Sequence, residues 1–217
     1  MAYTDETRAR LTADSAAIIA RYPRARSALL PILHLVQSEE GYVSEDGIEF
    51  AAETLGLTPA EVIAVATFYT MYRRRPAGRY HVGVCTNTLC AVLGGDAILA
   101  DLREHLGITG DATTPDGMVS LEHVECNAAC DYAPVVMVNW EFFDNQTVAS
   151  ARELVDRLRA GDPPTPTRGA GLTSFTETER MLAGFDDGRA DEGPAAGPAS
   201  LAGLALYRSA TTSGGEK

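Results

Sequence analysis

The chain has 217 residues, and its contents of 45% hydrophobic and 22% charged residues are typical of a globular protein. Its formal net charge of −12 argues against a nucleic-acid partner, because binding to phosphates requires a basic face. The longest strongly apolar stretches, such as ALLPILHLV at residues 28–36, are too short to span a bilayer, so we expect no membrane insertion.

The N-terminal stretch MAYTDETRARLTADS lacks the apolar segment of a secretory signal. Its acidic residues Asp5, Glu6 and Asp14 also argue against a mitochondrial transit peptide. We therefore expect a cytoplasmic protein, in which free thiols stay reduced.

Helices are predicted first along the chain, at residues 27–37, 44–56 and 58 to about 72. The strongest local signal begins the third of them. Thr58 is placed to cap this helix, Pro59 occupies its first position, and Glu61 completes a capping box. These patterns predict an N-terminal helical bundle over residues 1–76. The run Arg73–Arg75 at its end is either a solvated surface or an interface contact.

The pattern changes after Arg79. A strand is predicted at 80–85, a helix at 95–107, a strand at 118–126, a hairpin within 133–143 and a helix at 145–161. This order predicts an α/β or α+β layer with one helical face, of thioredoxin-like type, over residues 77–160. We expect a trans bond before Pro134, although thioredoxin-like folds can hold a cis bond there.

Residues 161–217 are rich in Pro, Gly and Ala, which predicts an irregular C-terminal extension without a core of its own. Two patches within it, at residues 176–185 and 201–208, could form short helices. We expect the extension to lie against a partner protein.

All four cysteines lie in two short loops, CTNTLC at 85–90 and CNAAC at 126–130. Disulfides fit a cytoplasmic chain poorly, and neither pair has the C-x-x-C spacing of a thioredoxin redox pair. Structural zinc uses C-x2-C to C-x4-C knuckles, which include both loops, although CTNTLC is wide for one. A 2Fe–2S cluster needs four thiolates, two for each iron, and loops of unequal length can enclose such an elongated group. The spacing therefore leaves zinc and iron–sulfur chemistry as candidates.

Beyond its cysteines, the sequence resembles the E subunit of the proton-pumping NADH:quinone oxidoreductase, respiratory complex I, a thioredoxin-like 2Fe–2S ferredoxin family. The family pattern is C-x4-C followed by C-x3-C behind a helical bundle. Similar stretches cover roughly residues 20–145 and include LLPILHLVQ, GYVS, ATFYTMY, PAGRYHVGVC, TTPDG and VECNAACDYAPVV.

The resemblance implies that four residues ligate one 2Fe–2S cluster: Cys85, Cys90, Cys126 and Cys130. It also implies that the chain is an electron-transfer subunit of this translocase and exchanges single electrons with FMN. FMN and NADH would be bound by the neighbouring flavoprotein, the F subunit, and the iron–sulfur G subunit would be a second partner. The expected location is the peripheral arm on the cytoplasmic face of the inner membrane.

We expect neither an NADH nor a quinone site in this chain. NADH binding is disfavoured because the G-x-G stretch at 169–171 lies in the extension with no strand before it. The acids Glu122, Glu125 and Asp131 favour a low cluster potential. His123 is expected to be an ordinary strand histidine. Two alternatives remain: the same module in an NAD-linked hydrogenase or formate dehydrogenase, and a zinc-stapled assembly protein without a redox role.

Overall fold

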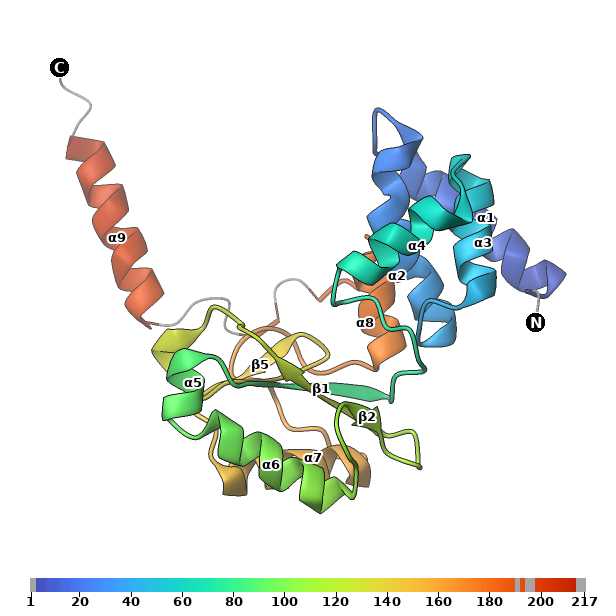
Figure 1. The fold of residues 1–217 in the computed structure, drawn as a ribbon. Coiled ribbons are helices and arrows are strands. Elements are labelled where there is room, and N and C mark those ends of the chain that lie inside the picture. The colour runs from blue at the N-terminus through green and yellow to red at the C-terminus, as the bar shows by residue number, and fades with distance from the viewer. Residues whose placement is uncertain (1–2, 190–191, 194–197, 214–217) are drawn as a thin grey trace.

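A computed structural model describes residues 3–189, 192–193 and 198–213 of the chain. Figure 1 shows an N-terminal helical bundle beside a mixed β-sheet, with helices α6 and α7 covering the face of the sheet away from the bundle. The two parts have separate cores, one of bundle residues and one formed between the sheet and these helices. None of the described helices is long and apolar enough to cross a membrane.

The bundle consists of α1 (Asp5–Ile19), a 3₁₀ turn (Ala25–Ala28), α2 (Leu29–Glu40), α3 (Glu45–Leu55) and α4 (Pro59–Phe68). The predicted caps are present. The Ser44 side chain accepts the Gly47 N–H, and Thr58 and Glu61 form the reciprocal capping box that starts α4. The predicted helical bundle is therefore confirmed.

Helix α4 ends at Phe68, four residues before the predicted end near residue 72. The cause is a buried side chain of α2. Gln37 donates from Nε2 to the Met71 carbonyl at 3.0 Å and accepts the Arg73 N–H at 2.6 Å. These bonds satisfy two backbone groups after Phe68, which offsets part of the loss of helical hydrogen bonds where the chain leaves the helix.

The sheet has the order β2-β3-β1-β4-β5. Its strands are β1 (Tyr80–Cys85), β2 (Ala112–Thr113), β3 (Val119–Val124), β4 (Val136–Val138) and β5 (Glu141–Phe143). Strand β1 pairs in parallel with β3 and antiparallel with β4, in a register that places Cys85 opposite Val124. The expected thioredoxin-like layer is confirmed, with the short edge strand β2 as an unpredicted addition.

Three helices accompany the sheet: α5 (Thr88–Val92), α6 (Gly95–Leu106) and α7 (Val148–Ala160). Both predicted helices, α6 and α7, end at a glycine in the left-handed conformation, Gly107 and Gly161. The single turn α5 was not predicted. The bond between Ala133 and Pro134 is cis, where a trans bond was expected.

Part of the C-terminal extension lies against its own chain. Helix α8 (Phe175–Leu182) packs along α2 (Figure 1), with Phe175 fully buried and Ala183 in the core of the bundle. The expected helix near residues 176–185 is present, but an intramolecular surface covers it, where a partner was expected. Helix α9 (Pro198–Ser213) extends away from the body of the molecule, and Leu206 and Tyr207 on it are exposed.

Candidate metal centre

The parallel pair β1 and β3 brings the two cysteine loops to one edge of the sheet. Cys85 is the last residue of β1 and lies opposite Val124, the last residue of β3. Cys126 follows Val124 after a single residue. Because neighbouring parallel strands end at the same edge, loops that are distant in sequence begin side by side. The Cys85 N–H donates to the Val135 carbonyl at 3.1 Å, which also fixes this edge to the start of β4.

The first loop turns back on itself so that Cys90 faces inward. The Asn87 side chain caps α5 by accepting the Thr88 N–H at 2.7 Å and the Thr88 hydroxyl at 2.9 Å. This turn buries Cys90, and Cys85 is buried to the same extent. The two thiols share a small apolar cluster with Ala129 and Val135.

A close backbone approach holds this loop at the start of α6. A Cβ atom added to Gly95 would lie 2.4 Å from the Cys85 carbonyl oxygen and 2.9 Å from that of Cys90. Only glycine fits this position, because both neighbours are backbone atoms. The sequence signal was the GG pair at 94–95, which we did not connect with the cysteines.

The second loop leaves its thiols at the surface. Cys126 and Cys130 are both exposed, in contrast to the first pair. Ala128 between them has a positive φ of 52°, and its N–H donates to Cys126 Sγ at 3.3 Å. Nδ2 of Asn127 is buried and has no acceptor in the described part of the chain. The loop therefore places a backbone donor beside the Cys126 sulfur, which is an arrangement that stabilises metal-bound thiolates.

Thiols of both loops interact electrostatically. Burial raises the pKa of the Cys90 thiol to about 11, and a backbone hydrogen bond at Val135 opposes this rise. A hydrogen bond from the Cys90 thiol to Cys85, and the charges of Cys85 and Cys130, raise it further. A cation bound here would remove this penalty, since metal ligation displaces the thiol protons. Four thiolates are suitable ligands for zinc or an iron–sulfur cluster. However, no three His, Cys, Asp or Glu side chains within the described residues form a group that could hold a metal ion.

A cavity of about 630 Å³ opens beside the second loop. Glu122 lines it from β3, Cys126 from the second loop, Met71 from the linker after α4, and Trp140 from the β4–β5 turn. Exposed His123 also borders it, and its backbone N–H donates to Asp111 Oδ1 at 3.2 Å.

Glu122, one of the acids expected to oppose added negative charge, has a cationic partner in the structure. It pairs with Arg73 and lies 2.9 Å from Nε2 of His81. Burial alone would raise the pKa of Glu122, but the hydrogen bond and charge of His81, together with Arg73, bring it below its ordinary value. The negative charge of Glu122 is therefore partly compensated, which weakens its expected lowering of the reduction potential of a cluster.

Comparisons with known proteins agree with this fold. Residues 15–159 match the family described as thioredoxin-like [2Fe-2S] ferredoxin. A Mycobacterium tuberculosis (strain ATCC 25618 / H37Rv) protein, named as the E subunit of NADH-quinone oxidoreductase, is 64% identical over 207 residues, which are 95% of this chain and 82% of the relative. A Thermus thermophilus protein named NADH-quinone oxidoreductase subunit 2 is 41% identical over 145 residues, 65% of this chain and 80% of that protein.

Among solved structures, an NAD⁺-reducing [NiFe]-hydrogenase in its air-oxidized state superposes with a TM-score of 0.56 at 22% identity. The match covers 62% of this chain and 23% of the hydrogenase chain. At this identity the likeness concerns the fold alone.

Proposed function

The chain belongs to the thioredoxin-like [2Fe-2S] ferredoxin family and is a homologue of the complex I E subunit, and on this premise we propose that it transfers single electrons through one 2Fe–2S cluster. The proposed ligands are the four cysteines of the two loops: Cys85, Cys90, Cys126 and Cys130. The observation that carries this assignment is the register of β1 against β3, which starts both loops at one edge of the sheet. When bound, the cluster accepts and releases one electron at a time.

The chain's own residues have distinct tasks in this proposal. Gly95 lets the first loop close tightly and keeps Cys90 buried. The Ala128 N–H and the Asn127 amide supply donors near Cys126, and hydrogen bonds to the sulfurs raise the potential of a cluster. Burial of the first pair excludes water from one side, while the exposed second pair leaves a short path to a redox partner.

We propose the NADH-oxidising module of NADH:quinone oxidoreductase as the host assembly. Its flavoprotein, the F subunit, which would bind FMN and NADH, is the proposed electron partner, and the iron–sulfur G subunit is the proposed second contact. The 64% identity to proteins named as the E subunit of this oxidoreductase supports the assignment. The proposed location is the peripheral arm on the cytoplasmic face of the inner membrane.

The cluster is tested by analysis of anaerobically purified protein. We expect about two irons and two acid-labile sulfides per chain, visible absorption bands, and an EPR signal after dithionite reduction. Cys126→Ser should remove the native signal, whereas Leu89→Ala, an exposed change beside Cys90, should retain it. Colourless protein that contains zinc and no iron would contradict the proposal, as would a wild-type EPR signal from Cys126→Ser.

The host assembly needs a separate measurement. Affinity purification of the tagged chain from its own cells should recover a flavoprotein that oxidises NADH, together with quinone-reductase subunits. Recovery of hydrogenase or formate dehydrogenase subunits in their place would contradict the proposed host assembly, while the proposed cluster would be unaffected.

A further inference from the structure

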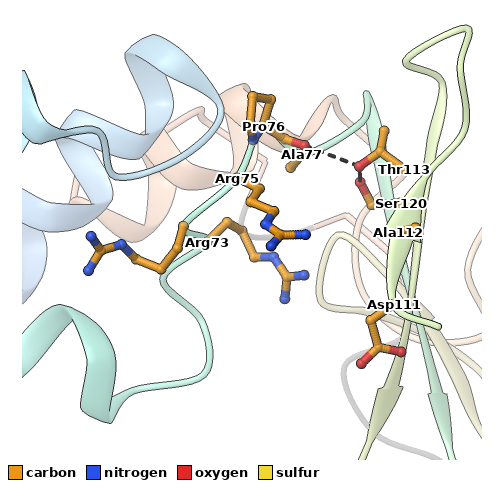
Figure 2. A pocket seen from close by; sticks show the side chains of 9 residues that line it. Arg73, Arg75, Pro76, Ala77, Asp111, Ala112, Thr113 and Ser120 are labelled. Carbon is orange, nitrogen blue, oxygen red and sulfur yellow. Dashed lines mark hydrogen bonds between the residues drawn. The ribbon is translucent and has the colours of Figure 1, made fainter.

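A second cavity, of about 470 Å³, lies between the end of the bundle and the edge of the sheet. Figure 2 shows Arg75 reaching into this gap, with Thr113 and Ser120 on the opposite wall. The lining comes from the linker residues 73–77, from Asp111 and strand β2, and from Ser120 of β3. Three consecutive arginines line a cavity here in a chain whose net charge is −12.

The backbone under these arginines is held on both sides. Toward the bundle, Arg73 receives the Val43 N–H on its carbonyl at 2.8 Å, and the Ala77 N–H donates to the Gly41 carbonyl at 3.1 Å. Toward the sheet, the Thr113 hydroxyl donates to the Pro76 carbonyl at 3.1 Å. The arginine side chains therefore project from a fixed backbone, which lowers the entropy lost when they bind a ligand.

The charges that line the cavity do not cancel. Arg73 is paired with Glu122, and Asp111 lies 3.1 Å from Arg103. Arg74 and Arg75 are exposed and have no acidic partner within residues 3–189, 192–193 and 198–213. The lining of the cavity therefore carries more positive than negative charge, with three arginines against one aspartate.

We propose that this cavity binds a small phosphate-bearing anion through Arg74 and Arg75. A guanidinium group presents a planar fork of N–H donors that matches the oxygens of a phosphoryl group. A cavity of about 470 Å³ also falls in the size range of small-molecule sites. Arg74 also borders a neighbouring cavity that contains Glu45 and Asp46, so Arg75 makes the larger contribution.

The site is distinct from the cysteine loops but adjoins the cavity beside Cys126, because Asp111 lines both. Arg73 connects the two regions as well, through its ion pair with Glu122. A bound anion would therefore lie beside the linker that joins the bundle to the ferredoxin-like domain. This inference does not depend on the identity of the metal centre.

Binding is tested with the full-length protein by isothermal titration calorimetry with inorganic phosphate and pyrophosphate at constant ionic strength. We expect one site per chain and tighter binding of pyrophosphate. The double variant Arg74→Gln/Arg75→Gln should lose affinity by about tenfold or more, since each charged hydrogen bond contributes substantially. The control variant Arg8→Gln/Arg24→Gln removes two exposed charges elsewhere on the bundle and should bind pyrophosphate as wild type does.

Three results would overturn the proposal. Wild-type protein that binds neither anion excludes the site, and an equal loss in the control variant shows only a general effect of charge. The third result is that Arg74→Gln/Arg75→Gln protein binds both anions as wild type does but no longer co-purifies with a partner protein. This result would assign the cavity to a protein contact.

Discussion

Oε2 of Glu179 lies 2.6 Å from Nδ1 of His34, although 145 positions separate the two residues in the sequence. Glu179 is fully buried, and its other carboxylate oxygen accepts the Trp140 indole N–H at 3.3 Å. One side chain of α8 thus connects α2 of the bundle with the β4–β5 turn of the ferredoxin-like domain. The C-terminal extension contributes directly to how the two parts are joined.

Removal of this carboxylate should destabilise the protein. Glu179→Ala leaves the partly buried His34 ring and Trp140 N–H without their partner, which costs about 2–4 kcal/mol. Urea denaturation followed by circular dichroism should show a lower midpoint than for wild type. Glu153→Ala, an exposed change on α7, should leave the midpoint unchanged within error. Equal midpoints for both variants would refute the structural role of Glu179.

Two truncations distinguish the contributions of α8 and α9 to thermal stability. Deletion of residues 165–217 removes α8 with the buried Phe175 side chain and should lower thermal stability strongly, because loss of a buried Phe side chain alone costs about 3–5 kcal/mol. Deletion of residues 190–217 removes the exposed α9 and should leave the melting temperature unchanged. Differential scanning fluorimetry compares the two, and similar melting temperatures would contradict the packing of α8.

Gly95→Ala should disturb the first cysteine loop. The added methyl group meets the Cys85 and Cys90 carbonyl oxygens, so the loop must shift before the helix can form. We expect a lower iron content per chain and a lower unfolding midpoint. Gly203→Ala on α9 is a matched control, since no atom lies within 4 Å of its added Cβ. Normal iron content in Gly95→Ala would show that the loop tolerates a wider path.

Alkylation of the metal-free protein should distinguish the thiols. Burial raises the pKa of Cys90 to about 11, so its reactive thiolate is scarce at neutral pH. Its iodoacetamide modification should be slow at pH 7 and rise about tenfold per pH unit below its pKa. Exposed Cys126 should react first, as peptide mass spectrometry can follow. Fast modification of Cys90 at pH 7 would contradict its burial.

The capping box of α4 predicts a pH dependence. Hydrogen bonds from the Thr58 backbone, with Arg26 and the Thr58 hydroxyl, lower the pKa of Glu61 to about 2. The lowered pKa means that the stabilisation is present above the ordinary pKa of 4.5 and is lost as pH falls toward 2. Glu61→Gln should therefore melt below wild type at pH 6, and the difference should shrink between pH 4.5 and 2. A pH-independent difference would show that the charge is not involved.

Local signals predicted much of the fold. Ser44 and Thr58 marked helix starts because a cap is a contact between residues three positions apart. The early end of α4 could not be predicted in this way, since it depends on Gln37, more than thirty positions earlier. The packing of α8 on α2 depends on still more distant contacts, and composition alone suggested an irregular segment.

The candidate site likewise has features that local sequence predicts and features that depend on long-range contacts. Spacing and resemblance predict the four cysteines as ligands, because that information lies within each loop, and this assignment stays a prediction. The unequal burial of the two pairs and the contact of Gly95 with both carbonyls required the register of β1 and β3 and the path of α6. The compensation of Glu122 by Arg73 likewise depends on the linker lying against the sheet.

The difference in exposure between the cysteine pairs gives assembly of the proposed centre a direction. In the proposed centre, iron and sulfide that arrive from solvent would meet the exposed Cys126 and Cys130 before the buried Cys85 and Cys90. Damage follows the same route, since oxidants also arrive from solvent. Loss and repair of the proposed cluster would therefore begin at the exposed pair of thiols.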